Sequence, residues 1–234
     1  MKIDSTIWLK LIYTKGNMHH IQKYILRTLM YTKKARFTDM RPPKVDSNAY
    51  SYHLRVLIKR GLVEKIDSLY RLSPEGLFYV DKVSMDNLEP RIQPKIITMI
   101  VITDDANNVL MFPKTKQPFI QAYMLPFGKV HLDDLTVLEA ASREVIEKVG
   151  VEPSKLKHVG DCYIHAKING HLVWNVLAHV MTAKIDKTKV DAPNHKWLST
   201  AERKSYKLLP ATEQIIDAVL KSKTFFFDNF EVDW

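Results

Sequence analysis

Two glutamates, Glu144 and Glu147, stand three residues apart in the segment "REVIEKVGV", residues 143–151. On a helix, side chains three positions apart lie on the same face, so both carboxylates can reach a common point. Mg²⁺ prefers hard oxygen ligands and usually accepts one or two carboxylates together with water and the phosphate oxygens of a substrate. The spacing therefore predicts a site for Mg²⁺ and a pyrophosphate compound, with Glu144 and Glu147 as metal ligands.

A lysine, Lys148, follows Glu144 at four positions. A glutamate followed by a lysine at this spacing forms a favourable ion pair, and the ammonium brings positive charge close to the expected metal. An ammonium can hold a phosphate as a point charge, but it does not lower the pKa of a bound water as a metal does. Two interpretations stay open. Lys148 weakens hydrolysis more than ligand binding, or Lys148 is merely solvated and one Mg²⁺ is still held.

The helix that must carry these charges has clear end signals. Thr136 and Glu139 form a T-x-x-E capping box, so we predict a helix that begins near Val137 and ends before Gly150. Its charged residues from 143 to 148 are expected to lie off the buried face. The apolar residues at helical spacing form that predicted buried face: Leu138, Ala141, Val145 and Val149.

This region resembles the Nudix signature, G-x5-E-x7-R-E-U-x-E-E-x-G-U, in which U is aliphatic. Gly128 matches the opening glycine, Asp134 replaces the first glutamate with a shorter acid, and "REVIEKVGV" matches the core. The resemblance extends over roughly residues 95–221. It implies an α/β/α sandwich around a mixed sheet.

The resemblance also implies roles for individual residues. Those expected to act in catalysis are Arg143, Glu144 and Glu147, and Arg143 would orient the loop through Asp134. Those expected to bind the ligand are Gly128, Lys129, Asp134 and Lys148. Two departures stand out: eight residues instead of seven separate Asp134 from Arg143, and Lys148 replaces the last glutamate. A further distal acid is expected, and Asp186 and Asp191 are the available residues.

The segments around this helix have the patterns of strands. A hairpin is predicted in "KIITMIVITDDANNVLMFPK", residues 95–114, and an extended piece in "QAYMLPFGKV", residues 121–130. Another hairpin is predicted in residues 167–185, where Asn169-Gly170 is a favoured turn. A strand followed by a helix is expected in "KWLS…LLPATEQIIDAVL".

The positive charge of the chain is unevenly distributed. The whole sequence has a formal net charge of +9. Residues 1–95 carry 18 lysines and arginines against 9 acids, whereas residues 96–234 carry 17 of each. A basic part joined to a neutral part indicates that the first meets a polyanion.

The basic part has a pattern of helices and short strands. We predict a helix in residues 18–32, a short helical turn at 37–40 and a helix in 48–61 that Asp46 or Ser47 caps. The last of these has Tyr50, Leu54, Leu57 and Ile58 on its apolar stripe and stops at Gly61. A hairpin in residues 62–73 and a helix that starts at Pro74 follow.

This order resembles a winged helix-turn-helix over residues 18–83, in which residues 47–60 would be the recognition helix. Side chains early or midway along it would be offered to base edges in the major groove, and basic residues at its end and on the hairpin would contact phosphates. The expected base contacts are Asn48, Tyr50, Ser51, His53 and Arg55. The expected phosphate contacts are Lys59, Arg60, Lys65 and Arg71. Winged helices also serve as protein-interaction modules, so this alternative stays open.

We therefore expect an α+β protein with two domains, a winged helix-turn-helix in residues 1–88 and a Nudix-like domain in residues 89–234. The lone Cys162 excludes an internal disulfide framework, and no run approaches membrane-spanning length. The start of the chain lacks a signal-peptide cleavage site. These features predict a cytoplasmic protein without a membrane partner.

Two functions remain open at this point. The first is a ligand-responsive, DNA-binding transcriptional regulator, whose Nudix-like domain binds a nucleoside-diphosphate compound with weak or no hydrolysis. The resemblance to Nudix-related regulators of NAD metabolism, in which the Nudix part comes first, implies a ligand like ADP-ribose and a homodimer. The alternative is an active hydrolase of nucleoside diphosphates linked to another group, with Mg²⁺ as a cofactor weakened by Lys148. A scaffold without ligand is a third interpretation.

Overall fold

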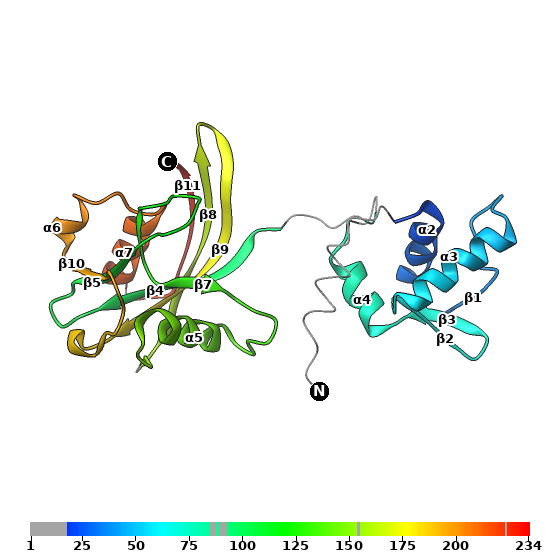
Figure 1. Ribbon diagram of the computed structural model, residues 1–234, viewed down its shortest axis with the longest axis horizontal. Helices are drawn as coiled ribbons and strands as arrows, with labels where there is room; N and C mark the ends of the chain where they lie inside the picture. The colour runs from blue at the N-terminus through cyan, green and yellow to red at the C-terminus, as the bar shows by residue number, and fades with distance from the viewer. Residues whose placement is uncertain (1–17, 85–87, 89–92, 154, 223) are drawn as a thin grey trace. The chain divides into compact units, whose positions relative to one another are not determined.

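The computed structural model describes residues 18–84, 88, 93–153, 155–222 and 224–234 (Figure 1). By its internal contacts the chain divides into two units, Met1–Gln93 and Pro94–Trp234. The boundary expected between residues 88 and 89, and the first 17 residues, fall on or beside positions outside the described ranges. Every helix of the described part is too short or too polar to cross a lipid bilayer.

Three helices build most of the first unit: α2 (His20–Met30), α3 (Ser47–Lys59) and α4 (Pro74–Asp81). All three confirm the expected helices. Asp46 caps α3, because its side chain accepts hydrogen bonds from the amides of Asn48 and Ala49. Gly61 then ends α3 at φ +71°, a conformation that glycine adopts without steric cost.

A three-stranded antiparallel sheet completes the first unit, in the order β1-β3-β2. The hairpin is made by β2 (Val63–Ile66) and β3 (Leu69–Leu72), and Asp67 takes a positive φ in its turn. Residues 37–40, where one short helical turn was expected, form hydrogen-bonded turns that do not extend into a helix. They follow a strand β1 (Ala35–Arg36) that the sequence did not indicate.

The core of the first unit lies between α2, α3 and the sheet. Tyr50, Leu54 and Leu57 of α3 are buried in it, as expected, whereas Ile58 is 37% exposed and does not belong to the stripe. The order helix, turns, helix, hairpin and helix with a small sheet is consistent with a winged helix-turn-helix, although turns stand where the sequence predicted a short helix. The chain as a whole is α+β.

The second unit contains a mixed sheet in the order β10-β5-β4-β9-β8-β11. Its centre pairs β4 (Lys95–Thr103) in parallel with β9 (His171–Lys184), and β9 runs antiparallel to β8 (Lys157–Ile168). The turn between β8 and β9 is the expected Asn169-Gly170, both with positive φ. The remaining strands are β5 (Val109–Pro113), β6 (Tyr123–Met124), β7 (Phe127–Lys129), β10 (Lys196–Leu198) and β11 (Phe226–Asp233).

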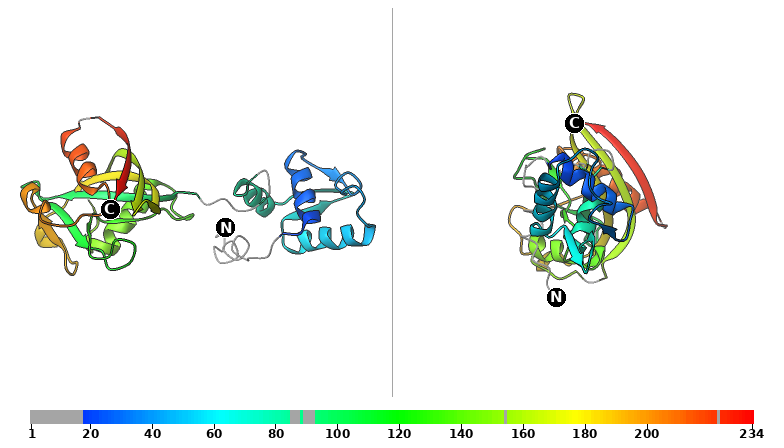
Figure 2. Two further views of the ribbon diagram at one scale, coloured as in Figure 1. Left: turned by 90° about the horizontal axis from the view of Figure 1, so that it is seen from above. Right: turned by 90° about the vertical axis from the view of Figure 1, so that its right-hand side faces the viewer.

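Helices cover both faces of this sheet, as Figures 1 and 2 show. On one face α5 (Val137–Val149) packs Val145 against Ile100 and Ile102 of β4. On the other face α7 (Thr212–Lys221) packs Ile215 and Ile216 into a larger core. The short α6 (Thr200–Arg203) and the 3-10 helix η1 (Lys187–Lys189) lie in the connections. The sheet is therefore the mixed, helix-covered sheet that the sequence predicted.

The ends of α5 follow the sequence closely, but its buried face does not. Thr136 Oγ1 accepts a hydrogen bond from the Glu139 amide at 3.1 Å, and the helix ends at Gly150 with φ +74°. The expected capping box is offset, because the Glu139 side chain accepts from the amide of Leu135 rather than of Thr136. Leu138 is 43% exposed, so it was wrongly assigned to the buried face, where Ala140 lies instead.

The aromatic tail closes one edge of the sheet. Strand β11 runs parallel to β8 over eight paired residues, from Phe226 opposite Gly160 to Asp233 opposite Lys167. Phe226 packs against the core of the second unit, while Phe227 is exposed. The tail therefore packs onto its own domain.

Candidate functional site

Arg143 on α5 ties the preceding loop to the helix. Its Nε and Nη2 lie 3.1 and 2.8 Å from the two carboxylate oxygens of Asp134, and Nη2 donates to the carbonyl oxygen of Lys129 at 3.1 Å. The His131 amide donates to the same aspartate at 2.7 Å. The hydrogen bond from Arg143 lowers the pKa of Asp134. The loop thus keeps its anchor in spite of the additional residue.

Glu144 is buried beside this bridge, with its side chain 6% exposed. Its Oε1 lies 3.0 Å from Arg143 Nη1, and its Oε2 lies 3.5 Å from Lys148 Nζ. The carboxylate rests on Gly128, where an added Cβ would come within 1.6 Å of it. The expectation that Glu144 lies off the buried face was therefore wrong, because the glycine opens a space that the carboxylate fills. Both of its oxygens face a cation.

Glu147 is different, since its side chain is 57% exposed. Its Oε1 lies 3.7 Å from Arg143 Nη1, the same nitrogen that contacts Glu144. The carboxylates of Glu144 and Glu147 thus both lie next to the guanidinium of Arg143. Three carboxylates and two cations leave this cluster with a net charge of −1, whereas a glutamate in place of Lys148 would give −3. Attraction for a divalent cation is correspondingly weaker.

Neither expected distal acid supplies a third ligand. Asp186 caps η1 by accepting from the Thr188 amide, and Asp191 lies against Gly150 at the end of α5. Among the described residues, the one group of three or more side chains suited to share an ion lies on β8 and β9 and contains neither Glu144 nor Glu147. The residues around α5 therefore fit Mg²⁺ poorly.

The sheet of the second unit contains buried polar atoms that lack a hydrogen-bond partner. Among the described residues, no partner is found for Thr98 Oγ1, His165 Nε2 and Asn175 Oδ1. His165 and Asn175 are directly opposite each other in the β8–β9 pair. Because buried polar atoms are almost always satisfied, atoms of this kind indicate a surface that a polar ligand or water completes. The alternation of polar residues along β8 and β9 is the sequence signal for this surface.

Comparison with known families decides the assignment of the second unit. Residues 93–219, more than half of the chain, match the family model of the NUDIX domain. The chain belongs to the Nudix family. The match covers the helix with Arg143 and Glu144, so the ion pairs described above lie in the signature region of a Nudix domain.

Solved structures resemble the Nudix domain at low identity. A MutT protein from Bacillus halodurans is 19% identical with a TM-score of 0.49, over 59% of this chain and 90% of that one. The Nudix domain of Shewanella oneidensis NrtR in complex with ADP-ribose is 16% identical with a TM-score of 0.48, over 56% and 89%. NrtR with a 27mer DNA is 17% identical with a TM-score of 0.45, over 52% and 58%. A search of curated proteins gave no significant match.

The exposed side of α3 carries most of the residues expected to contact DNA bases. Asn48 and Arg55 are exposed, and Ser51 is partly exposed. Tyr50 was wrongly included, because its side chain is fully buried and its hydroxyl donates to the carbonyl oxygen of Phe37 at 2.7 Å. Tyr52, which the sequence did not single out, is 58% exposed on the same helix. The polar residues that neighbour Tyr52 at helical spacing were the sequence signal that this side chain is exposed.

The His53 side chain is partly buried in the first unit. Its ring stacks on His19 at 3.9 Å, and its Nδ1 is buried without a partner. Burial lowers the pKa of His53, and the neighbouring His19 and His20 lower it further. His53 therefore favours the neutral form, and one face of its ring stacks on the residue that caps α2.

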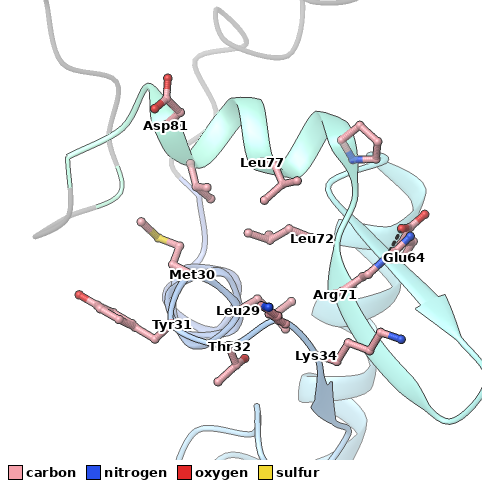
Figure 3. Close-up of a pocket in the computed structure, with 13 residues that line it drawn as sticks. Leu29, Met30, Tyr31, Thr32, Lys34, Glu64, Arg71, Leu72, Leu77 and Asp81 are labelled. Carbon is pink, nitrogen blue, oxygen red and sulfur yellow. Dashed lines mark hydrogen bonds and ion pairs between the residues drawn. The ribbon is translucent and has the colours of Figure 1, made fainter.

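The basic residues expected at phosphates lie in two places. Lys59 is exposed and Arg60 partly exposed at the end of α3, and Lys65 lies over the Tyr70 ring on the hairpin. Arg71 pairs with Glu64 at 2.6 Å, which neutralises its charge locally. Figure 3 shows this pair at one end of an open pocket, in which Leu29, Leu72 and Leu77 gather between α2 and α4. No residue of α3 lines that pocket.

Proposed function

We propose that the chain is a ligand-responsive, DNA-binding transcriptional regulator. In this proposal a winged helix-turn-helix in residues 1–88 binds DNA. A Nudix domain in residues 89–234 binds a nucleoside-diphosphate compound, such as ADP-ribose, with weak or no hydrolysis. The observation that carries the proposal is the ion pair between Lys148 and the buried Glu144.

The ion pair between Lys148 and Glu144 would weaken hydrolysis without weakening ligand binding. Lys148 and Arg143 both face Glu144, so a metal that would activate water has to bind this carboxylate against two nearby positive charges. A diphosphate needs only positive charge and hydrogen-bond donors, and Lys148 together with the exposed Lys129 supplies charge close to Gly128. The unpartnered polar atoms of Thr98, His165 and Asn175 would then receive the rest of the ligand.

One observation favours the alternative, an active Nudix hydrolase. The bridge between Arg143 and Asp134 retains the loop anchor with two hydrogen bonds, and Glu147 keeps a carboxylate that is accessible from solvent. In this alternative Lys148 is a tolerated neighbour, and hydrolysis proceeds at a diphosphate bond. The two proposals differ in one measurable quantity, the turnover of a bound ligand.

Turnover and binding are therefore measured on the same samples. ADP-ribose, NAD, a dinucleoside polyphosphate and a nucleoside triphosphate are each tested with Mg²⁺. We expect the wild type to bind at least one without turnover, and Lys148→Glu to gain affinity for Mg²⁺ by about tenfold or more, since one charge pair near 4 Å contributes on the order of 1–4 kcal/mol. Turnover by the wild type that Glu147→Gln abolishes would establish the hydrolase instead.

The matched control for Lys148→Glu is Lys221→Glu. Lys221 pairs with Asp217 four positions earlier on α7, so it repeats the acid–lysine spacing at an exposed position of the same domain. This substitution introduces the same change of charge away from the signature. It should leave both Mg²⁺ affinity and turnover at the wild-type level, and an equal effect of the two substitutions would show that net charge alone is responsible.

DNA binding is proposed from the surface of α3. Arg55 and Lys59 are exposed and Arg60 is partly exposed, and the helix contains no aspartate or glutamate between Ser47 and Lys59. Unpaired positive charge of this kind attracts the phosphate backbone, and the neutral Nudix half of the chain has no such excess. Because regulators of this type read two half-sites, the proposal includes a homodimer.

Salt dependence tests this part of the proposal. The affinity for mixed genomic fragments should fall steeply as salt rises. Arg55→Ala with Arg60→Ala should reduce the slope of log K against log salt by roughly 1 for each phosphate that the variant no longer neutralises. Lys189→Ala with Lys204→Ala removes the same charge from exposed positions of the Nudix domain and is the control. An affinity that does not change with salt, or an equal loss in both double variants, would contradict DNA binding through α3.

A further inference from the structure

The hairpin of β8 and β9 places two histidines and an aspartate around one point. Asp161 Oδ1 lies 2.8 Å from His158 Nε2 and 2.7 Å from His179 Nδ1. The ligand atoms of the three side chains all lie within 4.8 Å of one another. Each side chain is partly exposed, between 19 and 26%, so an ion can enter from solvent. We propose that these three residues form a binding site for a divalent transition metal ion of the Zn²⁺ type.

An irregularity in β8 creates this arrangement. His158 and Asp161 are three apart, and in a regular strand an odd separation puts side chains on opposite faces. The register shifts between His158, which pairs with Met181, and Gly160, which pairs with Val180, so Val159 is an extra residue in β8. Such a bulge reverses the alternation from that point on. His158 and Asp161 therefore share one face.

The partner strand supplies the third ligand on that same face. His179 is directly opposite Asp161, and directly opposed residues of an antiparallel pair point to the same side. The rings of His158 and His179 meet edge to face, with centroids 5.3 Å apart, so their nitrogens approach the carboxylate from two directions. The Phe225 ring stands against His158 at 5.1 Å and shields one side of it.

The donor set selects the kind of ion. Two imidazole nitrogens and one carboxylate oxygen suit Zn²⁺ and neighbouring transition metals, whereas Mg²⁺ prefers a shell of oxygens. Metal bonds of roughly 2.0–2.1 Å place tetrahedral ligand atoms about 3.3–3.4 Å apart. The two hydrogen-bonded contacts, at 2.7 and 2.8 Å, need to open by about half an ångström to admit the ion. Three protein ligands leave a coordination position for water or a ligand oxygen.

This site is separate from the carboxylates of α5. It shares no residue with the cluster around Arg143, and it does not depend on whether the Nudix domain hydrolyses or only binds its ligand. Without an ion, both imidazoles donate a hydrogen bond to Asp161 and the triad is a hydrogen-bonded link between β8 and β9. For metal binding, each neutral imidazole would carry its proton on the other ring nitrogen, and bonds to one cation would replace the two hydrogen bonds.

The test uses the full chain, freed of metal with a chelator and equilibrated with Zn²⁺ or with Mg²⁺. We expect about one Zn²⁺ per chain by elemental analysis and none displaced by excess Mg²⁺. Asp161→Asn and His179→Gln should each weaken Zn²⁺ binding by at least about tenfold, as even the loss of a group that only supports a ligand has an effect of this order. Equal retention by both variants, or no retention by the wild type, would overturn the proposal.

Two control variants separate this site from the other histidines. His171→Gln removes an exposed histidine from the same hairpin, and His53→Gln removes a member of the stacked histidines of the first unit. Both should bind Zn²⁺ as the wild type does, and a loss in either one equal to that in His179→Gln would overturn the assignment. If a site variant does not fold, Co²⁺ titration of the wild type and of His171→Gln still tests whether the metal site exists. Ligand-field absorption stronger than that of hydrated Co²⁺ supports the site, and its absence contradicts it.

Discussion

Helices α3 and α5 are built alike and use their charges in opposite ways. Each has 13 residues, a side-chain cap at its start and a glycine with positive φ at or just after its end. On α5, Arg143 and Lys148 are both paired with acids of their own helix. On α3 there is no acid at all, and the Arg55 side chain donates to a carbonyl oxygen of its own helix.

The difference shows what fixes the role of a charged helix. Paired charges largely cancel beyond a few ångströms, so on α5 their electrostatic effect is limited to the space around Gly128. Unpaired charges of one sign act over a distance of about 10 Å at moderate salt and attract an extended polyanion. Both helices are amphipathic, but α5 buries the charged Glu144 whereas α3 buries no charged residue. The pairing of the charged residues therefore separates the two helices.

The largest expected losses of stability come from the buried apolar residues that α3 and α5 both have. Leu57 of α3 and Val145 of α5 are fully buried. Leu57→Ala should lower the free energy of unfolding by about 3 kcal/mol, and Val145→Ala by about 2 kcal/mol, because each leaves a cavity in a packed core. Urea denaturation followed by circular dichroism measures both. Tyr52→Ala, on the exposed side of α3, is the control and should change stability by less than about 0.5 kcal/mol.

A smaller loss of stability is expected when the ion pair between Arg143 and Asp134 is removed. Asp134→Asn removes the charge that Arg143 binds with two hydrogen bonds, and we expect a loss of about 2 kcal/mol in the free energy of unfolding at pH 7. The neighbouring exposed Asp133→Asn should have almost no effect. Equal losses in the two variants would show that the bridge does not stabilise the domain.

The pH dependence of this difference has a defined sign. The hydrogen bond from Arg143 holds the pKa of Asp134 below its ordinary value of 3.8. The carboxylate therefore contributes its full stabilisation above pH 3.8, and this contribution is lost as the pH falls through the lowered pKa. The gap in stability between wild type and Asp134→Asn should accordingly narrow in acid.

The smallest expected effect compares the two caps. Thr136→Ala should lower the free energy of unfolding by about 1 kcal/mol, independently of pH, since a hydroxyl does not titrate in this range. Asp46 differs, because hydrogen bonds from the amides of Ala49 and Asn48 lower its pKa below 3.8. The effect of Asp46→Ala should thus be present above pH 3.8 and fade as the pH falls further. Thermal unfolding at pH 3 and pH 7 distinguishes them, and two caps with the same pH response would contradict this difference.

Local rules predicted most of the fold. The caps at Asp46 and Thr136, the stops at Gly61 and Gly150 and the Asn169-Gly170 turn depend on neighbouring residues, and all five are confirmed. The errors arose where distant residues decide. Strand β1 pairs with β3, which lies more than thirty residues later in the chain, and the exposure of Leu138 depends on how α5 packs against the sheet.

The candidate site shows the same division. The bridge between Arg143 and Asp134 followed from the resemblance to the signature, and the structure contains it. The burial of Glu144 did not follow from helical spacing, since it depends on Gly128, which lies sixteen residues earlier on another element. The triad of His158, Asp161 and His179 was equally invisible, because a bulge in the pairing of two strands creates it.

The parallel pairing of β4 with β9 has a consequence for synthesis of the chain. Thr182 of β9 donates to the carbonyl oxygen of Val101 across 81 positions of sequence. Contacts of such separation form slowly, whereas those of the first unit are local and form early. During translation, β5 and β7 can pair with β4 early, but the edge of β4 that pairs with β9 stays open until β9 has left the ribosome. In this interval the open edge of an apolar strand is a site where aggregation can begin.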